Sequence, residues 1–180
     1  MTILPKQTSL TLPIQPYQVS GYSFKERLRR HLVLWTTHLG DDILAPAGTA
    51  VYAIGGGTIE LSQMHPGSAA KPNWGGLVII AHTNKHTKDT FYSIYGHLDQ
   101  LKFKQGNTVA AGQQLGLVAA GNSPANGWWQ KAHLHFGICT TRWRGLVPPG
   151  WRRPEQWRRT KTSHWHNPEQ FIKQYNLADS

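Results

Sequence analysis

The chain has 180 residues, 39% of them hydrophobic, and its 19 Lys and Arg outnumber its 9 Asp and Glu to give a formal net charge of +10. This length suits one domain with a sizeable core. The sequence holds no apolar run of about 18 residues, which excludes a membrane-spanning helix, and its single cysteine, Cys139, excludes an intramolecular disulfide. The positive charge favours anionic polymers or surfaces as partners.

The first half of the chain predicts an extended arm and then strands. Residues 1–23 are rich in Pro, Thr and Gln and lack the apolar segment of a classical signal peptide, so we expect an extended arm, with a processed mature chain as the alternative. Residues 25–35 predict a basic turn followed by a strand. Residues 47–61 predict two strands hinged at glycines 55–57, and residues 62–76 predict a loop rich in Gly, Pro, Ser and Asn.

Further strands are predicted in the second half. Residues 76–82 and 89–98 are apolar segments joined by a polar turn, which predicts a hairpin. Residues 105–121 predict another pair of strands interrupted by Gly, residues 121–131 a loop, and residues 132–140 the last strong strand.

The strand pattern ends at Thr141, where a segment rich in Trp, Arg and Pro begins. Residues 167–175 predict a short helix with Asn167 as its N-cap and Pro168 at its first position. We therefore predict a mainly β fold with antiparallel strands and a short C-terminal helix. We divide the chain into an N-terminal extension (1–30), a core (31–140), a Trp/Arg-rich insert (141–165) and a C-terminal closing element (166–180).

The Trp/Arg-rich insert has no helical or strand period, and residues 141–161 hold seven basic side chains against one acidic. One interpretation is an adhesive surface for an anionic, sugar-rich polymer, in which Arg pairs with anions and Trp stacks on sugars. The other is an irregular flap that covers one end of the sheet while its Arg side chains stay solvated. A nucleic-acid surface is a weaker alternative, because no such fold signature accompanies it. The tryptophans concerned are Trp143, Trp151, Trp157 and Trp165.

A constellation of polar residues lies close to the predicted strand ends. In AHLHFG (132–137), the period of a strand places His133 and His135 on one face and the intervening apolar residues on the other. His38 and Asp42 are four residues apart just after a strand, and His97 ends an aromatic strand. Imidazole and carboxylate groups suit zinc, and a catalytic zinc takes three such ligands.

Four histidines and one aspartate would supply one set of ligands and two helpers, a base and an oxyanion donor. The spacing alone does not say which histidine ligates, and unrelated surface histidines remain the alternative. The other histidines show no ligand spacing. We expect His65 to lie in a loop and His164 and His166 to be exposed. His82 ends an apolar strand, so this side chain can either line a site or serve only the packing of the strand.

At this point the motifs and their order resemble those of the lysostaphin-type (LytM-like) zinc peptidoglycan endopeptidases. HLGDD matches H-x-G-x-D and runs into APAGTAVYAIGGGTI, after which GLVIIAH, YSIYGHL, GNTVAAGQQLGLVAAGNS and HLHF follow in the family's order. NPEQFI resembles the family's closing element. The resemblance covers residues 31–140 and 166–172.

The resemblance implies a groove on an antiparallel β-sheet with Zn²⁺ on its floor. It implies that His38, Asp42 and His135 are the metal ligands, that His133 is the general base or orients the water, and that His97 is its partner in stabilising the oxyanion. The implied reaction is hydrolysis of a peptide bond in peptidoglycan. Because the set is complete, we expect an active enzyme, and a non-catalytic wall-binding or amidase-regulating module is the alternative.

Three departures from the family pattern lie where a groove wall is expected. They are the Gly75-Gly76 step, Gly137 after HLHF, and Trp128 and Trp129 in the loop before it. None removes a ligand, so they bear on substrate specificity. The D-Ala–diaminopimelate cross-link and a glycine bridge both stay open as the bond cleaved.

Delivery to the wall is the last expectation. We expect action in the periplasm or the extracellular wall after export by a specialised route, as an antibacterial effector or phage-type lysin, and a mature secreted form is the alternative. An effector would have an immunity or inhibitor protein as partner. We further expect a monomer, with neither a nucleic-acid partner nor a membrane span.

Overall fold

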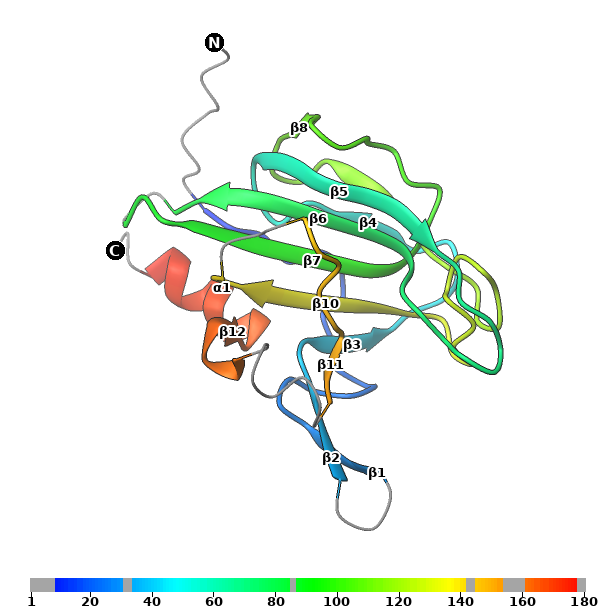
Figure 1. Ribbon diagram of the computed structural model, residues 1–180. Helices are drawn as coiled ribbons and strands as arrows, with labels where there is room; N and C mark the ends of the chain where they lie inside the picture. The colour runs from blue at the N-terminus through cyan, green and yellow to red at the C-terminus, as the bar shows by residue number, and fades with distance from the viewer. Residues whose placement is uncertain (1–8, 31–33, 85–86, 142–144, 154–160, 178–180) are drawn as a thin grey trace.

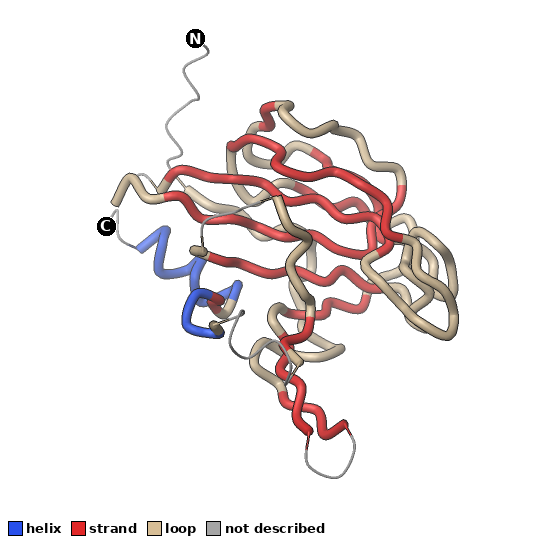
Figure 2. The backbone as a smooth tube through the Cα atoms, viewed as in Figure 1, coloured by secondary structure: helices blue, strands red, loops and turns tan. Residues whose placement is uncertain are grey.

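The computed structural model describes residues 9–30, 34–84, 87–141, 145–153 and 161–177. These residues form a nine-stranded antiparallel sheet, a smaller three-stranded sheet and a helix at the C-terminal end (Figures 1 and 2). The predicted mainly β, antiparallel fold with a short C-terminal helix is therefore confirmed. No helix within the described residues is long and apolar enough to cross a membrane.

The large sheet has the order β12-β10-β7-β6-β5-β8, with β3 beside β10 and β9 beside both β4 and β7. The strands of this sheet are β3 (Asp41–Leu44), β4 (Ala50–Tyr52), β5 (Gly57–His65), β6 (Gly75–Thr83), β7 (Thr90–Asp99), β8 (Thr108–Val109), β9 (Gln114–Val118), β10 (His133–Cys139) and β12 (Trp165–His166). The predicted hairpin is present as β6 and β7. The two strands predicted in residues 105–121 are present as β8 and β9, which pair with other strands of the sheet.

The central strands are buried on both faces, which explains their nearly continuous apolar sequences. In β6, Val78 and Ile80 belong to the main hydrophobic core, whereas Leu77 and Ile79 belong to a second cluster on the opposite face. The second cluster also contains Trp165 of the insert. Because successive side chains of a strand point to opposite faces, each central strand contributes to both hydrophobic clusters.

The small sheet consists of β1 (Arg27–Arg30), β2 (Leu34–His38) and β11 (Trp151–Arg152) in the order β1-β2-β11. Residues 25–35 were predicted as a turn and one strand, but β1 pairs with β2 as an antiparallel hairpin. This hairpin projects from the lower end of the molecule in Figure 1. His65, predicted in a loop, is instead the last residue of β5.

Both ends of the described chain pack on the main core. Leu10 and Ile14 are buried in it, and the amide of Leu10 donates to Asn176 Oδ1 (2.8 Å). Asn176 lies in α1 (Pro168–Leu177), whose buried residues include Ile172. As predicted, Asn167 caps this helix, because its Oδ1 accepts the backbone N–H of Gln170 at 2.9 Å.

His82 lies in the interior of the sheet and takes no part in the site described below. Its Nδ1 donates to the carbonyl of Gly56 (2.8 Å), its Nε2 accepts from Ser93 Oγ (2.7 Å), and its ring stacks on Phe91 with centroids 4.8 Å apart. Burial lowers the pKa of His82 to about 4. The folded protein therefore holds this imidazole neutral where the unfolded chain protonates it.

This depressed pKa predicts a loss of stability in acid. Between about pH 6.5 and about pH 4, the His82 side chain is protonated in the unfolded state but not in the folded state. The free energy of unfolding therefore decreases over this range, by up to about 3 kcal/mol. Denaturant unfolding at several pH values, with chelator present throughout, measures the slope of the free energy of unfolding against pH. We expect His82→Phe to flatten this slope and the exposed-site control His164→Phe to leave it unchanged. Parallel curves for wild type and His82→Phe would refute the assignment.

Candidate metal centre

Three strands bring the predicted metal ligands together. His38 ends β2, Asp42 lies in β3 and His135 lies in β10. The register of β3 and β10 sets His135 directly opposite Asp42, so their side chains share a face. Leu134 and Phe136 point into the main core on the opposite face and are fully buried, as the strand period predicted.

The three donor atoms form a compact triangle. His135 Nδ1 lies 2.9 Å from Asp42 Oδ1, His38 Nε2 lies 3.3 Å from the same oxygen, and the two nitrogens are 3.1 Å apart. Ligands bound tetrahedrally to zinc at about 2.0–2.1 Å are about 3.3 Å from one another. The triangle therefore has the dimensions of one face of a zinc tetrahedron, with the fourth position left for water or substrate.

A close approach of two backbones makes this triangle possible. The step between β2 and β3 contains Gly40, the glycine of the H-x-G-x-D motif. A Cβ at this position would lie 2.5 Å from the carbonyl oxygen of Phe136 and 2.7 Å from His135 Nε2. Only a glycine lets the β2–β3 segment lie this close to β10.

Backbone carbonyls fix which nitrogen of three imidazoles carries the proton. His38 Nδ1 donates to the carbonyl of Ser23 at 3.2 Å, which leaves a lone pair on Nε2. In the same way His97 Nδ1 donates to Asn126 (3.0 Å) and His133 Nδ1 donates to Lys131 (2.8 Å). Nε2 of each ring is then an acceptor.

The protonation states also suit a cation. Burial by itself raises the pKa of Asp42, but the neighbouring imidazoles, His135 at hydrogen-bond distance first and His38 second, outweigh burial and hold that pKa below its ordinary value. Burial lowers the pKa of His135 to about 4, and burial together with the neighbouring His133 lowers that of His97 well below 6.5. At neutral pH Asp42 is therefore a carboxylate and His135 a neutral imidazole, which are the forms in which these groups bind metal.

The neighbouring acid, Asp41, faces away from this cluster. Its Oδ2 accepts from the Tyr17 hydroxyl at 2.8 Å and its Oδ1 accepts from the backbone N–H of Phe24 at 2.9 Å. Asp41 therefore anchors the N-terminal arm to β3. Successive residues of one strand thus serve two purposes, because their side chains alternate.

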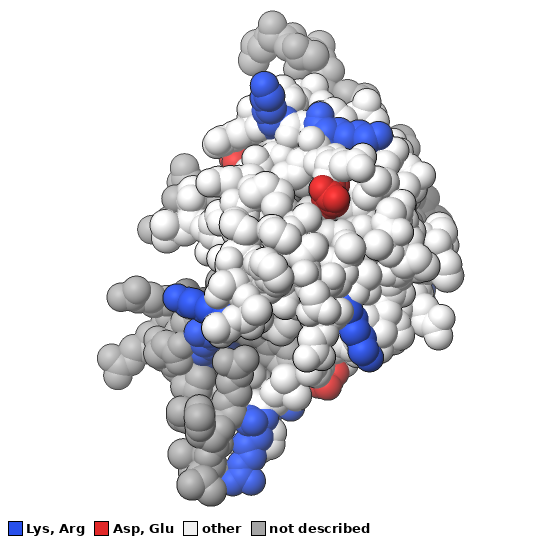
Figure 3. Space-filling view, turned by 90° about the vertical axis from the view of Figure 1, so that its right-hand side faces the viewer, with Lys and Arg blue, Asp and Glu red and all other residues white. Residues whose placement is uncertain are grey.

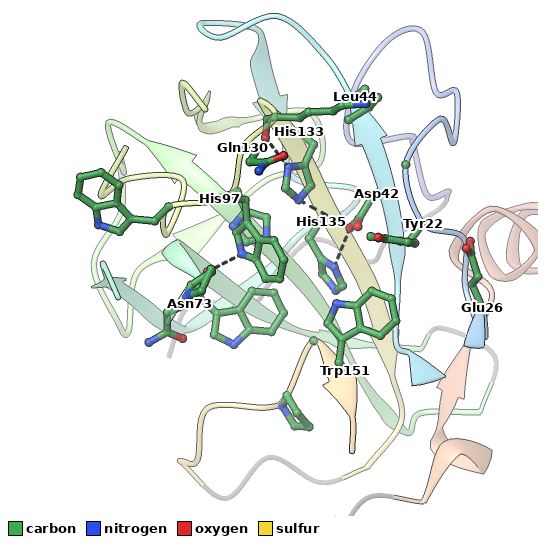
Figure 4. A pocket seen from close by; sticks show the side chains of 18 of the residues that line it. Tyr22, Glu26, Asp42, Leu44, Asn73, His97, Gln130, His133, His135 and Trp151 are labelled. Atoms are coloured by element: carbon green, nitrogen blue, oxygen red, sulfur yellow. Dashed lines mark hydrogen bonds and ion pairs between the residues drawn. The ribbon is translucent and has the colours of Figure 1, made fainter. Parts of the chain in front are cut away.

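His97 and His133 complete the cluster. His133 Nε2 lies 4.0 Å from Asp42 Oδ1, and the rings of His97 and His133 are 4.4 Å apart between centroids. Figure 4 shows these side chains and His135 converging on one spot at the floor of a groove. His97 adopts a left-handed backbone conformation (φ 65°), with its N–H bonded to the Trp74 carbonyl (3.0 Å) and its carbonyl to the Ala119 N–H (3.0 Å).

Aromatic side chains wall the groove, which has a volume of about 930 Å³. Trp128 and Trp129, predicted near a groove wall, line one part of it. Trp151 lies against the His38 ring with centroids 4.4 Å apart. The buried Trp74 stacks with His97 (6.0 Å) and donates its Nε1–H to the carbonyl of Pro148 at 2.9 Å.

The segment 145–153 of the insert therefore forms one wall of the groove. The sequence did not mark Trp74 as a residue of the site. Trp74 contacts both His97 and Pro148, which is 74 residues further along the chain, and no local pattern indicates such a contact. Trp165 of the insert is instead buried in the second core cluster. Trp143, Trp157 and four of the seven basic residues (Arg142, Arg144, Arg158 and Arg159) lie outside the described residues.

An open groove over a His–Asp–His triangle is typical of one class of protein, the metal-dependent hydrolases. The chain belongs to peptidase family M23, whose family model matches residues 36–145. This membership confirms the resemblance noted from the motifs.

Curated relatives include two peptidoglycan DD-endopeptidases of Vibrio cholerae. ShyA is 34% identical over 101 residues, which are 56% of this chain and 20% of ShyA. ShyC is 30% identical over 131 residues, which are 73% of this chain and 27% of ShyC. The chain thus spans about a fifth to a quarter of the length of these relatives.

Solved structures show the same fold. A zinc-containing peptidase from Vibrio cholerae aligns with a TM-score of 0.56 and 24% identity, over 73% of this chain and 37% of that one. The catalytic domain of the antimicrobial peptidase lysostaphin from Staphylococcus simulans aligns with a TM-score of 0.54 and 22% identity, over 85% and 90% of the two chains.

The triangle predicts binding of one zinc ion per chain. We expect His38→Ala, Asp42→Ala and His135→Ala each to weaken zinc binding by at least about 100-fold, since each removes one of three protein ligands. Competition titration against a chelating dye measures the affinity, with exposed His164→Ala as the control that keeps it. A variant of the triangle that binds zinc as tightly as wild type would refute this ligand set.

Proposed function

We propose that this chain is a zinc-dependent endopeptidase that hydrolyses peptide bonds of bacterial peptidoglycan. The observation that carries the proposal is the pairing of a three-donor triangle with two further imidazoles whose Nε2 atoms are acceptors beside it. A zinc ion held by His38, Asp42 and His135 would polarise the scissile carbonyl and lower the pKa of a bound water. The curated relatives named above support peptidoglycan as the substrate.

His133 is suited to be the general base. Its Nε2 lone pair lies 4.0 Å from Asp42 Oδ1, beside the triangle, and can take a proton from the attacking water. Its Nδ1–H stays bonded to the Lys131 carbonyl before and after this transfer, so the ring keeps its orientation. The Asp42 carboxylate at the same distance stabilises the imidazolium that forms.

His97 is suited to stabilise the oxyanion, but only after it gains a proton. Its Nδ1–H is committed to the Asn126 carbonyl, so neutral His97 offers only a lone pair toward the groove. We infer that the proton of the water reaches His97 by way of the adjacent His133, whose ring centroid lies 4.4 Å from that of His97. Protonated His97 Nε2 can then donate to the oxyanion or to the leaving nitrogen.

Among the bonds of peptidoglycan, we favour the D-Ala–diaminopimelate cross-link over a glycine bridge. The relatives that are at least 30% identical include proteins named DD-endopeptidases. The likeness to lysostaphin, at 22% identity, concerns the fold alone. Mass spectrometry of muropeptides released from the two kinds of wall distinguishes the two bonds.

Replacement of His133 is the test of the mechanism. We expect His133→Ala to retain zinc and to hydrolyse cross-linked muropeptides about 10²–10⁴ times more slowly, because the base is lost while the ligands stay. Liquid chromatography of digests from purified sacculi gives the rate, and His164→Ala is the matched control. Unchanged hydrolysis by His133→Ala would contradict this role. Zinc-loaded wild type that binds sacculi without cleaving them would favour the non-catalytic module instead.

The net charge of +10 supports a role for the chain as an antibacterial effector or phage-type lysin, because bacterial walls are anionic. Such a protein would harm a cell only on the wall side of the inner membrane. We expect expression with a periplasmic leader to lyse the host and cytoplasmic expression to be tolerated, with the His133→Ala form harmless in both places. Equal toxicity in the two compartments, measured by plating, would contradict the idea. Rescue by a co-expressed neighbouring gene product would reveal an immunity partner.

A further inference from the structure

The small sheet β1–β2–β11 has two faces with different chemistry. Along β2, Thr36 and His38 are buried, whereas Trp35 is exposed and Thr37 partly so. Trp151 of β11 is paired with His38 and lies on the buried face, where its ring contacts the His38 imidazole. This face therefore belongs to the groove.

The outer face is basic and aromatic. Arg27 pairs with Thr37 and Arg29 pairs with Trp35, and directly paired residues of antiparallel strands share a face. Arg152 pairs with Thr37 from the other side and so joins the same face. Among the described residues of these three strands none is acidic. Figure 3 shows Lys and Arg side chains at the lower end of the molecule, where Figure 1 places β1 and β2.

The arrangement of these groups is specific enough to indicate a ligand. The Arg27 guanidinium lies over the Trp35 ring, 4.9 Å from its centroid, and Arg27, Arg29 and Trp35 are all exposed. A guanidinium binds carboxylates with two parallel hydrogen bonds, and an indole ring stacks against the apolar face of a sugar. A surface that offers both fits a polymer in which sugars alternate with carboxylate-bearing peptides.

We propose that the outer face of β1–β2–β11 is a second binding site, for uncleaved peptidoglycan next to the bond in the groove. The choice of this polymer rests on the proposed function. The site would recognise carboxylates of neighbouring stem peptides through Arg27 and Arg29 and the glycan through Trp35. Because one sheet carries both the site and His38, binding here raises the concentration of cleavable bonds at the groove.

The test is binding of insoluble sacculi by the zinc-loaded His133→Ala protein, which blocks cleavage. We expect Arg27→Glu/Arg29→Glu to weaken binding at least about tenfold and to reduce its decline between about 50 and about 500 mM NaCl. Lys102→Glu/Lys104→Glu makes the same change of charge between β7 and β8 and is the matched control. Thermal unfolding of each variant checks its fold, and Trp35→Ala, which keeps the charge, should weaken binding on its own.

Two further arms test the chemistry of the ligand. Sacculi whose carboxylates have been converted to amides should bind wild type and the Arg variant equally weakly. With His133 restored, hydrolysis of a small soluble cross-linked muropeptide should be the same in wild type and in Arg27→Glu/Arg29→Glu.

Several outcomes would overturn the proposal. The first is that the Arg and Lys variants bind sacculi equally weakly, and the second is that wild type binds amidated sacculi as tightly as untreated ones. The third is that the Arg variant no longer hydrolyses the soluble muropeptide. The fourth is that the Arg substitutions weaken binding to RNA more than binding to sacculi. The proposed function fails separately if wild type cleaves nothing, because Arg-dependent binding to sacculi would still be observed.

Discussion

The pairing of β3 with β10 is the constraint on which the site depends. It sets His135 opposite Asp42, and both donor atoms lie within 3.3 Å of His38 Nε2. A slip of one residue would turn His133 and His135 into the main core and Leu134 and Phe136 toward the groove. The register is secured by those two apolar side chains, which are fully buried, and by Gly40, where any Cβ would collide with β10.

The imidazoles are organised from outside the cluster. Backbone carbonyls of Ser23, Asn126 and Lys131 accept the Nδ1–H groups of His38, His97 and His133. These carbonyls belong to the N-terminal arm and to the loop before β10, so segments that carry no catalytic side chain determine where the lone pairs point. For the proposed zinc ion, the bond of His38 to Ser23 orients one ligand before the ion binds, which lowers the cost of ordering that ligand.

The sequence predicted much of the architecture, because strand periodicity and turn residues are local. The hairpin β6–β7, the shared face of His133 and His135 and the cap at Asn167 all follow from residues close together in the chain. The roles that we propose for the five polar residues rest on the resemblance to the family, because their spacing predicts only that His133 and His135 share a face.

Other features could not be predicted, because they depend on contacts between distant segments. Trp74 reaches Pro148 across 74 residues, and the N-terminal arm is tied to α1 by the hydrogen bond of Leu10 to Asn176, 166 residues away. The pairing of β11 with β2 likewise turned part of an aperiodic insert into a groove wall. Neither residue composition nor periodicity records such contacts.

Anomalous diffraction at the zinc absorption edge from crystals of the zinc-loaded protein tests the central claim most directly. We expect one strong peak bound by His38 Nε2, Asp42 Oδ1 and His135 Nδ1, with His133 and His97 close by but not ligating. A zinc ion bound by His133 in place of His135, or a peak elsewhere with none at this triangle, would contradict it.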